Sequence, residues 1–262
     1  MDNLLNKIHF ADCLDVLRQI PDGSVDLFLQ DPPYGLTNCD WDILPDFAPL
    51  WNEWKRVSKP NAAFVFTATQ SFAYQLFNTN PKLFRYQIIW KKLTSTGFLD
   101  SQKKPLKAHE VILVFYQKLR TYNPIMMDAG RMRTGKRNSH CSTKLYGKPD
   151  NRKEKGWVET GLRFPTDVIE FDVDGERYNS TISKDLHPTK KPIDLFRYLI
   201  RTYTNPNDVV FDGYGGSGTT AIAAQMEGRR FIVCENHLPY FEASTARLSN
   251  LVAAPYLFSD CG

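Results

Sequence analysis

One short loop carries residue types that suit chemistry on an amino group. Asp31-Pro32-Pro33-Tyr34 follows the apolar run 25–29, one residue after its end. The exocyclic amino group of a nucleobase is a poor nucleophile because its lone pair is delocalised into the ring. The Asp31 carboxylate and the Pro32 carbonyl can accept its hydrogens, the two prolines hold that backbone rigid, and Tyr34 can stack on the base. The alternative is an Asx-type turn that only ends a strand.

A second loop suits a nucleoside cofactor. Residues 212–219, Asp-Gly-Tyr-Gly-Gly-Ser-Gly-Thr, follow a short apolar run, and glycines let a backbone approach a ligand closely. Glu235 ends the next predicted strand, where an acid can accept both hydroxyls of a ribose. Asp212 suits the cationic, amine-bearing end of a cofactor. The pattern is neither Gly-x-Gly-x-x-Gly nor a loop closed by Gly-Lys-[Ser/Thr], which argues against dinucleotide and triphosphate sites. A purely structural glycine turn is the alternative.

The elements that must position these loops follow from apolar periodicity. We predict strands over 7–10, 25–30, 62–67, 86–90, 110–116, 209–211 and 231–234, and helices over 13–20, 47–57, 72–77, 192–203, 219–227 and 239–251. Strands that alternate with helices predict a parallel sheet with helices on both faces. Both loops then lie at strand ends, where open α/β sheets bind ligands.

The composition is ordinary for a globular protein, with 42% apolar and 24% charged residues in 262. No apolar run approaches the roughly 20 residues that a membrane span needs, and we expect no signal peptide at the N-terminus. The five cysteines have no C-x-x-C spacing, and His187 has no partner at metal-ligand spacing. We therefore expect no disulfide framework, no metal, and a cytoplasmic location.

Basic residues are concentrated in one part of the chain. From Lys118 to Arg163 there are twelve basic residues against four acidic ones, so this stretch carries about +8 while the whole chain carries +4. The segment from about 117 to 184 also lacks periodicity, which is uncommon for a loop of that length unless it is functional or mobile. It is either a surface that faces phosphates or a solvated insert.

The chain resembles the amino-group DNA methyltransferases that use S-adenosylmethionine, in particular their β-class. Three runs carry the resemblance: Asp31–Tyr34, His187-Pro188-Thr189-Lys190-Lys191-Pro192, and Phe211–Thr220. The catalytic loop precedes the cofactor loop, and this order defines the class. Weaker similarities include 11–14, 88–91 and 109–115. The cofactor loop departs from the usual pattern, because Gly213, Tyr214 and an additional Gly215 stand where proline and phenylalanine are usual.

The resemblance implies a circularly permuted Rossmann-like α/β sheet with helices on both faces and a small insert. Residues 1–117 would form the catalytic half, 118–184 a basic target-recognition insert, and 185–262 the cofactor-binding half of the same domain. Asp31, Pro32, Pro33 and Tyr34 would be catalytic. The cofactor would be bound by Asp12, Thr189, Lys190, Pro192, Asp212, Tyr214, Gly216, Ser217, Gly218, Thr219 and Glu235. We expect Arg131, Arg133, Lys136 and Arg137 to contact DNA.

The function expected from the resemblance is sequence-specific methylation of adenine N6 in a base flipped out of double-stranded DNA, by a bacterial or phage-encoded enzyme. Cytosine-N4 methylation is the runner-up, and Asp31 favours adenine because cytosine-N4 enzymes often carry Ser-Pro-Pro-Tyr. Methylation of RNA or of a protein amide, and a DNA-binding module without catalysis, are less favoured alternatives. Neither loop is accompanied by a catalytic cysteine motif, which argues against methylation of a ring carbon. The sequence leaves open the recognition site, a homodimer, and a restriction endonuclease partner.

Overall fold

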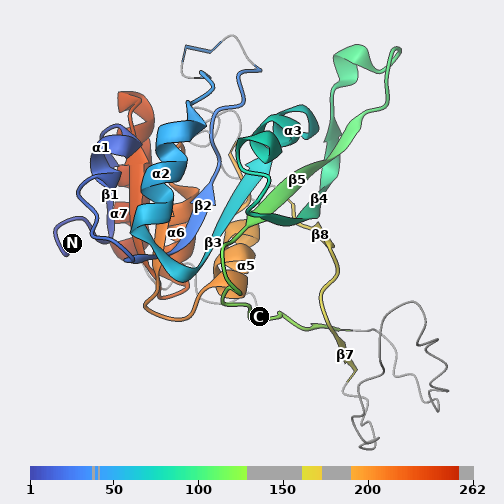
Figure 1. Ribbon diagram of the computed structural model, residues 1–262. Helices are drawn as coiled ribbons and strands as arrows, with labels where there is room; N and C mark the ends of the chain where they lie inside the picture. The colour runs from blue at the N-terminus through green and yellow to red at the C-terminus, as the bar shows by residue number, and fades with distance from the viewer. Residues whose placement is uncertain (37–38, 41, 129–160, 173–189, 254–262) are drawn as a thin grey trace, which may run out of the picture. The chain divides into compact units, whose positions relative to one another are not determined.

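The computed structural model describes residues 1–36, 39–40, 42–128, 161–172 and 190–253 (Figure 1). The chain divides into two compact units, one formed by residues 1–123 and 167–262 and the other by residues 124–166. Within the second unit, β6 (Met127–Asp128) pairs antiparallel with β7 (Leu162–Arg163). Both predicted loops, 31–34 and 212–219, lie in the first unit.

The first unit is built on one eight-stranded sheet with the order β1-β10-β9-β2-β3-β5-β4-β8. The strands are β1 (Lys7–Phe10), β2 (Val25–Gln30), β3 (Ser58–Ala68), β4 (Phe84–Thr96), β5 (Lys107–Phe115), β8 (Val168–Glu170), β9 (Val209–Asp212) and β10 (Arg230–Glu235). From β1 to β3 all pairings are parallel, and β2 joins the halves by pairing with β9 on one side and β3 on the other. All six side chains of β2 are buried, as expected for a central parallel strand.

The predicted parallel sheet has one exception, β5, which runs antiparallel to both β3 and β4. Only residues 97–106 connect β4 to β5, whereas a parallel connection needs a crossover of about a dozen or more residues, usually with a helix. A second difference is β8, which pairs parallel with β4 although it lies in the segment without periodicity.

Helices cover both faces of the sheet, as predicted (Figure 1). On one face lie α1 (Cys13–Leu17), α2 (Phe47–Val57) and α3 (Gln70–Thr79), and on the other lie α5 (Ile193–Tyr203), α6 (Thr219–Met226) and α7 (Leu238–Ala253). Alternate strand residues face the two cores. Phe28 and Phe64 pack toward the first set, while Leu27 and Val65 pack toward the second.

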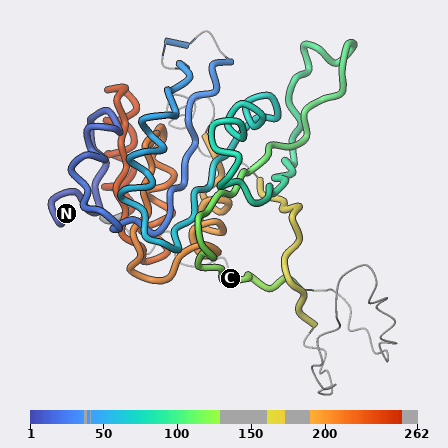
Figure 2. Tube along the Cα trace, viewed as in Figure 1, coloured from blue at the N-terminus to red at the C-terminus, as the bar shows by residue number. Residues whose placement is uncertain are grey.

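The path of the chain explains why distant segments meet (Figure 2). Strand β2, which precedes the predicted catalytic loop, comes early in the chain and β9 comes late, but they are neighbours in the middle of the sheet, with Phe28 opposite Phe211. Among the described residues, no helix combines the length and apolar character needed to cross a bilayer.

Candidate active site

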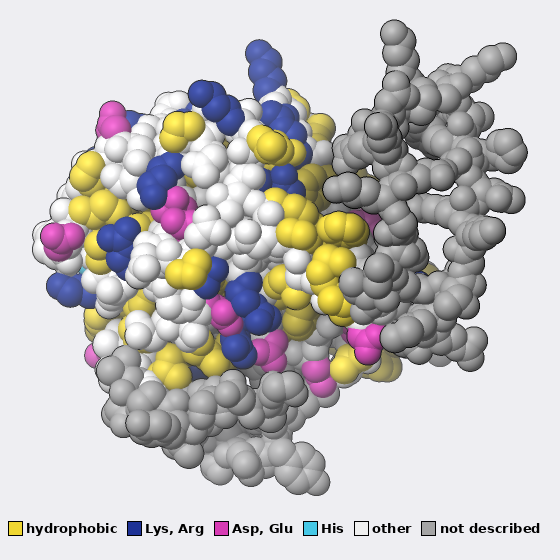
Figure 3. Space-filling view, turned by 90° about the horizontal axis from the view of Figure 1, so that it is seen from below, with side chains coloured by type: hydrophobic (Ala, Val, Ile, Leu, Met, Phe, Trp, Pro, Cys, Tyr) yellow, Lys and Arg dark blue, Asp and Glu magenta, His cyan; other side chains and the backbone are white. Residues whose placement is uncertain are grey.

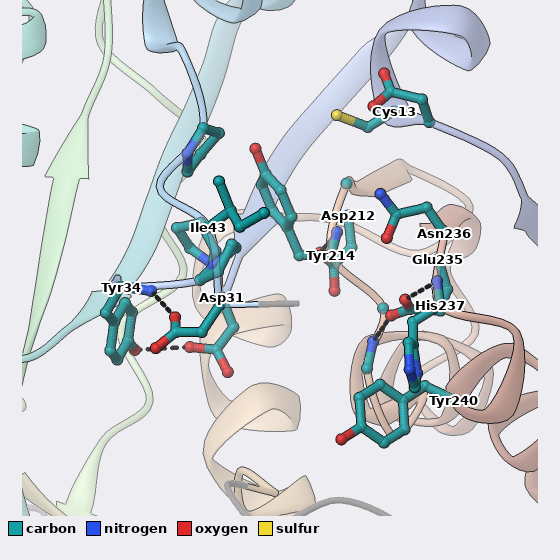
Figure 4. Close-up of a pocket in the computed structure, with 18 of the residues that line it drawn as sticks. Cys13, Asp31, Tyr34, Ile43, Asp212, Tyr214, Glu235, Asn236, His237 and Tyr240 are labelled. Atoms are coloured by element: carbon teal, nitrogen blue, oxygen red, sulfur yellow. Dashed lines mark hydrogen bonds between the residues drawn. The ribbon is translucent and has the colours of Figure 1, made fainter. Parts of the chain in front are cut away.

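The two predicted loops meet at the centre of one sheet edge. The connection after β2 leads to α2 on one face, whereas the connection after β9 leads to α6 on the opposite face. Chains that leave neighbouring strands in opposite directions open a crevice between them, and ligands bind there in open α/β sheets. A cavity of about 640 Å³ occupies this position and is lined by both loops (Figure 4). Its volume falls within the range of small-molecule and cofactor sites.

Asp31 is held by three elements. Its Oδ1 accepts hydrogen bonds from Thr67 Oγ1, at the end of β3, at 2.5 Å and from the Tyr34 hydroxyl at 2.7 Å. Its Oδ2 accepts from Lys191 Nζ at 2.8 Å, just before α5. A carboxylate has about four lone-pair sites, so Asp31 can still accept a hydrogen from a ligand in the cavity that it lines.

Lys191 is a buried cation in this site, only 6% exposed. Its Nζ lies 3.9 Å from Glu110 on β5, which also pairs with Lys92. Burial acts to lower the pKa of Lys191, but Asp31 and Glu110 outweigh it and raise that pKa above its ordinary value. The ammonium group therefore stays charged beside Asp31.

The backbone after the two prolines is fixed by Asp42. Its carboxylate accepts hydrogen bonds from the backbone N–H groups of Tyr34, Gly35 and Leu36 at 2.8–2.9 Å. The Tyr34 ring stacks on Phe72 of α3 with 4.8 Å between ring centroids. Asp31, Pro32, Pro33 and Tyr34 all line the cavity, so the loop reaches it with its carboxylate and ring already held in place.

The cofactor half of the cavity is built around two buried acids. Asp212 accepts from the Tyr214 backbone N–H at 2.9 Å and from the Thr220 hydroxyl at 2.5 Å. Glu235 accepts from the backbone N–H groups of Gly216 and His237, both at 2.7 Å. Burial raises the pKa of Asp212 to about 7 and also raises that of Glu235. These bonds hold the glycine loop against the ends of β9 and β10.

The structure brings most of the predicted cofactor residues to one cavity. Its lining includes Asp12, Lys190, Asp212, Tyr214, Gly216, Ser217, Thr219 and Glu235. Gly218 and Pro192 lie just outside, as the N-caps of α6 and α5. Asp12 uses its side chain to cap α1 through the Leu14 N–H at 2.8 Å. Thr189 and the predicted DNA-contacting residues Arg131, Arg133, Lys136 and Arg137 lie outside the described residues.

Three residues that hold the Asp31–Tyr34 loop in place were not predicted as site residues: Lys191, Thr67 and Asp42. Lys191 stands in the run 187–192 that carries the resemblance, but the prediction selected its neighbour Lys190. Thr67 ends a predicted strand, and a polar residue at that edge was an available signal. Asp42 lies eight residues after the tyrosine whose N–H it binds, and no local pattern indicates that contact.

Gly215, the additional glycine of the cofactor loop, has a packing reason. Its N–H donates to Cys234 O at 2.7 Å, which draws the loop against β10. A Cβ at this position would lie 2.6 Å from Val233 Cγ1 and 3.1 Å from Cys234 O. The loop can approach β10 this closely only with glycine here.

We therefore expect Gly215→Ala to lower the free energy of unfolding by about 1–3 kcal/mol, the usual cost of overpacking, and to weaken cofactor binding by displacing the loop. Chemical denaturation and calorimetric titration with S-adenosylmethionine measure the two effects. Gly23→Ala is the matched control, since its left-handed φ of 60° costs stability but nothing lies within 4 Å of the added Cβ. Equal cofactor affinity in both variants would contradict the prediction.

Comparisons with known proteins agree with this geometry. Residues 25–246 match the DNA methylase family of N6/N4 methyltransferases. The Type II methyltransferase M1.MboII of Moraxella bovis is 30% identical over 269 aligned residues, which cover 94% of this chain and 98% of that protein. The Type II methyltransferase M.HinfI of Haemophilus influenzae is 24% identical, covering 97% of this chain and 71% of the relative.

Solved structures share the fold. A crystal structure of the M1.HpyAVI–SAM complex has a TM-score of 0.59 at 21% identity, covering 92% of this chain and 99% of that one. The cytosine-N4-specific PvuII DNA methyltransferase has a TM-score of 0.64 at 16% identity, covering 95% and 91%. The family match spans both loops of the cavity and most of the sheet that carries them. This chain therefore belongs to the N6/N4 family of amino-group DNA methyltransferases.

Proposed function

We propose that this protein transfers the methyl group of S-adenosylmethionine to N6 of adenine in a specific sequence of duplex DNA, on a base flipped out of the helix. The observation that carries the proposal is the meeting of Asp31 and the glycine loop on one cavity. The similarity to two Type II methyltransferases supports a role in restriction–modification.

In this proposal Asp31 prepares the nucleophile. Bound S-adenosylmethionine supplies an electrophilic methyl group on a sulfonium sulfur. Asp31 accepts one hydrogen of the amino group, while the Pro32 carbonyl accepts the other, and together they favour a tetrahedral nitrogen whose lone pair can attack. As the N–C bond forms and the S–C bond breaks, the nitrogen releases one proton toward the Asp31 carboxylate. Positioning and fixed dipoles supply the acceleration, without a covalent enzyme intermediate.

The cofactor roles are proposed on the same geometry. Glu235 would accept the ribose hydroxyls with the lone pairs that its two backbone bonds leave free. Asp212 would face the positively charged end of the cofactor, and Asp12, Lys190 and Tyr214 would complete the lining. Duplex DNA would reach the cavity from its open edge, with Arg131, Arg133, Lys136 and Arg137 as the proposed contacts of the insert.

The fold does not distinguish adenine from cytosine as the target base, because a cytosine-N4 enzyme shares it with a TM-score of 0.64. The choice of adenine therefore depends on Asp31. We expect mass spectrometry of nucleosides from cells that express the chain to find N6-methyladenine, and sequencing of modified bases to locate one motif. Cells that express Asp31→Ala are the control. N4-methylcytosine alone would overturn the base assignment, and unmodified DNA would overturn the proposed activity.

The pKa of Asp212 predicts a pH dependence of cofactor binding. Burial raises this pKa to about 7, so the carboxyl group gains a proton as the pH falls below neutrality. A cationic cofactor prefers the carboxylate, so its affinity should rise with pH by up to about tenfold per unit below the pKa. Calorimetric titration between about pH 5.5 and 8.5 measures this, and Asp212→Asn should flatten the profile. An equal slope in the variant would contradict the assignment.

The raised pKa of Asp212 also affects the stability of the protein without cofactor. This stability should fall as the pH rises, whereas the affinity for the cofactor should increase. The ordinary pKa of an aspartate is 3.8, and folding raises it to about 7. The folded state therefore binds the proton more tightly, so the stabilising contribution is complete below the ordinary pKa and is lost as the pH rises toward 7. As the pH rises from about 4 to 7, the melting temperature of the wild type should fall by more than that of Asp212→Asn.

A further inference from the structure

Helix α5 leads away from the active site to the opposite edge of the sheet. At its N-terminal end, Lys191 precedes the N-cap Pro192 and donates to Asp31 at 2.8 Å. Phe196 in its first turn also lines the cavity. Residues 204–208 lead from the other end of the helix into β9, and the far end of β9 carries the cofactor loop, so α5 runs antiparallel to β9 (Figure 1). Over its 11 residues the helix covers about 16 Å.

The C-terminal end of α5 is held by Asn123, the last residue before the second compact unit. The backbone N–H of Asn123 donates to Thr202 O at 2.8 Å. Its side-chain amide donates to Arg201 O at 3.1 Å and to Thr204 O at 2.9 Å. The last carbonyls of a helix have no partner within the helix, so Asn123 supplies the donors that these carbonyls need.

The chain also contacts α5 where it returns from the second unit. Strand β8 pairs with β4, and the Phe171 carbonyl directly after it accepts from Trp90 Nε1 at 3.0 Å. The Phe171 ring lies against Tyr198 of α5, with 5.5 Å between ring centroids. Residues 124–166 are therefore flanked on both sides by segments that contact the same helix.

Arg120 strengthens the first of these attachments. Its Cζ lies 4.7–5.4 Å from the centroids of four tyrosine rings, those of Tyr86, Tyr116, Tyr122 and Tyr203. A cation over the face of an aromatic ring is attracted by the ring quadrupole. The Arg120 Nη2 also donates to the Tyr86 hydroxyl, which lies 2.9 Å from that of Tyr203. Tyr203 is the last residue of α5. We call Arg120 and these four tyrosines the Arg120 cluster.

The Arg120 cluster is an internal contact and does not belong to a surface of one charge. The Arg120 Nε is buried and has no hydrogen-bond partner among the described residues, so ring faces provide most of its surroundings. Figure 3 views the molecule from the end at which α5 terminates, and the described part of this face shows basic and acidic side chains interspersed. The observations therefore favour a role of Arg120 within the protein over a contact with phosphates.

We propose that Arg120 and Asn123 are positioning residues for methyl transfer. They fix the C-terminal end of α5, and this packed helix carries their effect to Lys191 at its other end, which holds Asp31. The chain continues from Asn123 into the second unit, so that unit and the carboxylate proposed to be catalytic share one rigid link. This inference rests on the proposed function.

The variant Arg120→Leu tests the cluster, because it removes the cation and keeps an apolar side chain. It should lower the single-turnover rate of methyl transfer to duplex DNA by about three- to tenfold, with unchanged affinity for S-adenosylmethionine. Arg120→Lys keeps a cation over the rings and should retain most of the rate. Arg85→Leu is the matched control, since Arg85 lies over the Tyr116 ring at 5.0 Å, and its rate should equal that of the wild type. A wild-type rate in Arg120→Leu would overturn the proposal.

The variant Asn123→Ala tests the second contact and keeps the proposal open to test if Arg120→Leu does not fold. It should lower the single-turnover rate by about two- to fivefold. Asn61→Ala is its control, because the Asn61 side chain donates to Thr121 Oγ1 at 3.1 Å and so holds the same segment from β3. Its rate should equal that of the wild type. The same loss in both variants would contradict a specific effect through α5.

The variant Lys191→Met distinguishes an effect through Lys191 from a general loss of structure. If Arg120 acts by positioning Lys191, adding Arg120→Leu to Lys191→Met should change the remaining rate by less than about twofold, because the two residues are then coupled. Equal fractional losses from Arg120→Leu in the wild type and in Lys191→Met would mean that the two residues act independently, and they would overturn the proposed link.

Amine labelling gives a measurement that does not require methylation. Lys191 is 6% exposed and paired with Asp31, so acetic anhydride should label it slowly in the wild type and in Arg85→Leu. In Arg120→Leu the labelling of Lys191, followed by mass spectrometry, should become several-fold faster, and an unchanged rate would overturn the link. A wild type that methylates no DNA would overturn the proposed function instead. Labelling would then still report whether Arg120 positions Lys191.

Discussion

Asp31→Ala is expected to lower the single-turnover rate of methyl transfer by at least about 10²–10³-fold, the usual cost of removing a preorganised group from a reacting atom. Asp31 brings a carboxylate to the cavity at a fixed position, held by Thr67, Tyr34 and Lys191. Affinity for S-adenosylmethionine should stay near that of the wild type, because residues 212–219 and Glu235 belong to another segment. Quench-flow kinetics and calorimetric titration measure the two quantities separately.

Asp31→Asn makes the test sharper. Alanine leaves the buried Lys191 without its nearest carboxylate, and breaking a buried ion pair can cost about 3–5 kcal/mol of stability, so melting temperatures must accompany the rates. Asparagine keeps the volume and one acceptor oxygen but cannot take a proton from the substrate nitrogen. Asp15→Ala, at an exposed ion pair with Arg18, controls for a change of net charge. A rate near wild type in a folded Asp31→Asn protein would contradict the proposed role.

Part of the fold could be predicted because some strands can be recognised from their own residues alone. In β2 and β9 every residue is buried, so a short apolar run bounded by polar residues was enough to locate them. The loops then had to lie at strand ends, and their meeting followed from the parallel arrangement. These local signals are the reason that the sequence could bring the two loops to the same cavity.

Strand direction and short strands could not be predicted, because they depend on contacts between distant residues. The antiparallel course of β5 is fixed by the short β4–β5 connection and by pairing with Phe64–Ala68. The three residues of β8 become a strand only by pairing with Ile89–Lys91. Nothing in the sequence of 168–170 alone distinguishes it from a loop.

The polar contacts of the site show the same limit. Thr67 and Lys191 reach Asp31 from positions 36 and 160 residues away along the chain. Lys190 and Lys191 are adjacent and chemically identical, so the sequence could not tell which of them is buried. Lys191 nevertheless provides the charged partner of Asp31, the carboxylate proposed to be catalytic, and it supports the second prediction with a large expected effect.

Lys191→Met should lower the methyl-transfer rate at neutral pH by about 10–100-fold. Lys191 Nζ lies 2.8 Å from Asp31 and 3.9 Å from Glu110, so its removal leaves two carboxylates near one another without this cation. Without that cation Asp31 loses the group that fixes its Oδ2, and a carboxylate that is free to move is less well placed to receive the proton of the amino group. The loss should appear in the single-turnover rate, measured by quench-flow kinetics.

Two companion variants separate this electrostatic role from simple packing. Lys191→Arg keeps the charge beside Asp31, so it should retain more of the rate than Lys191→Met does, although the longer side chain must fit a buried position. Lys191→Met/Glu110→Gln removes one of the two carboxylates that face the missing cation, so it should regain stability and part of the rate. If Lys191 only filled space, Lys191→Arg would lose as much rate as Lys191→Met, and the second substitution would restore nothing. That result would show that the charge of the buried ammonium does not support Asp31.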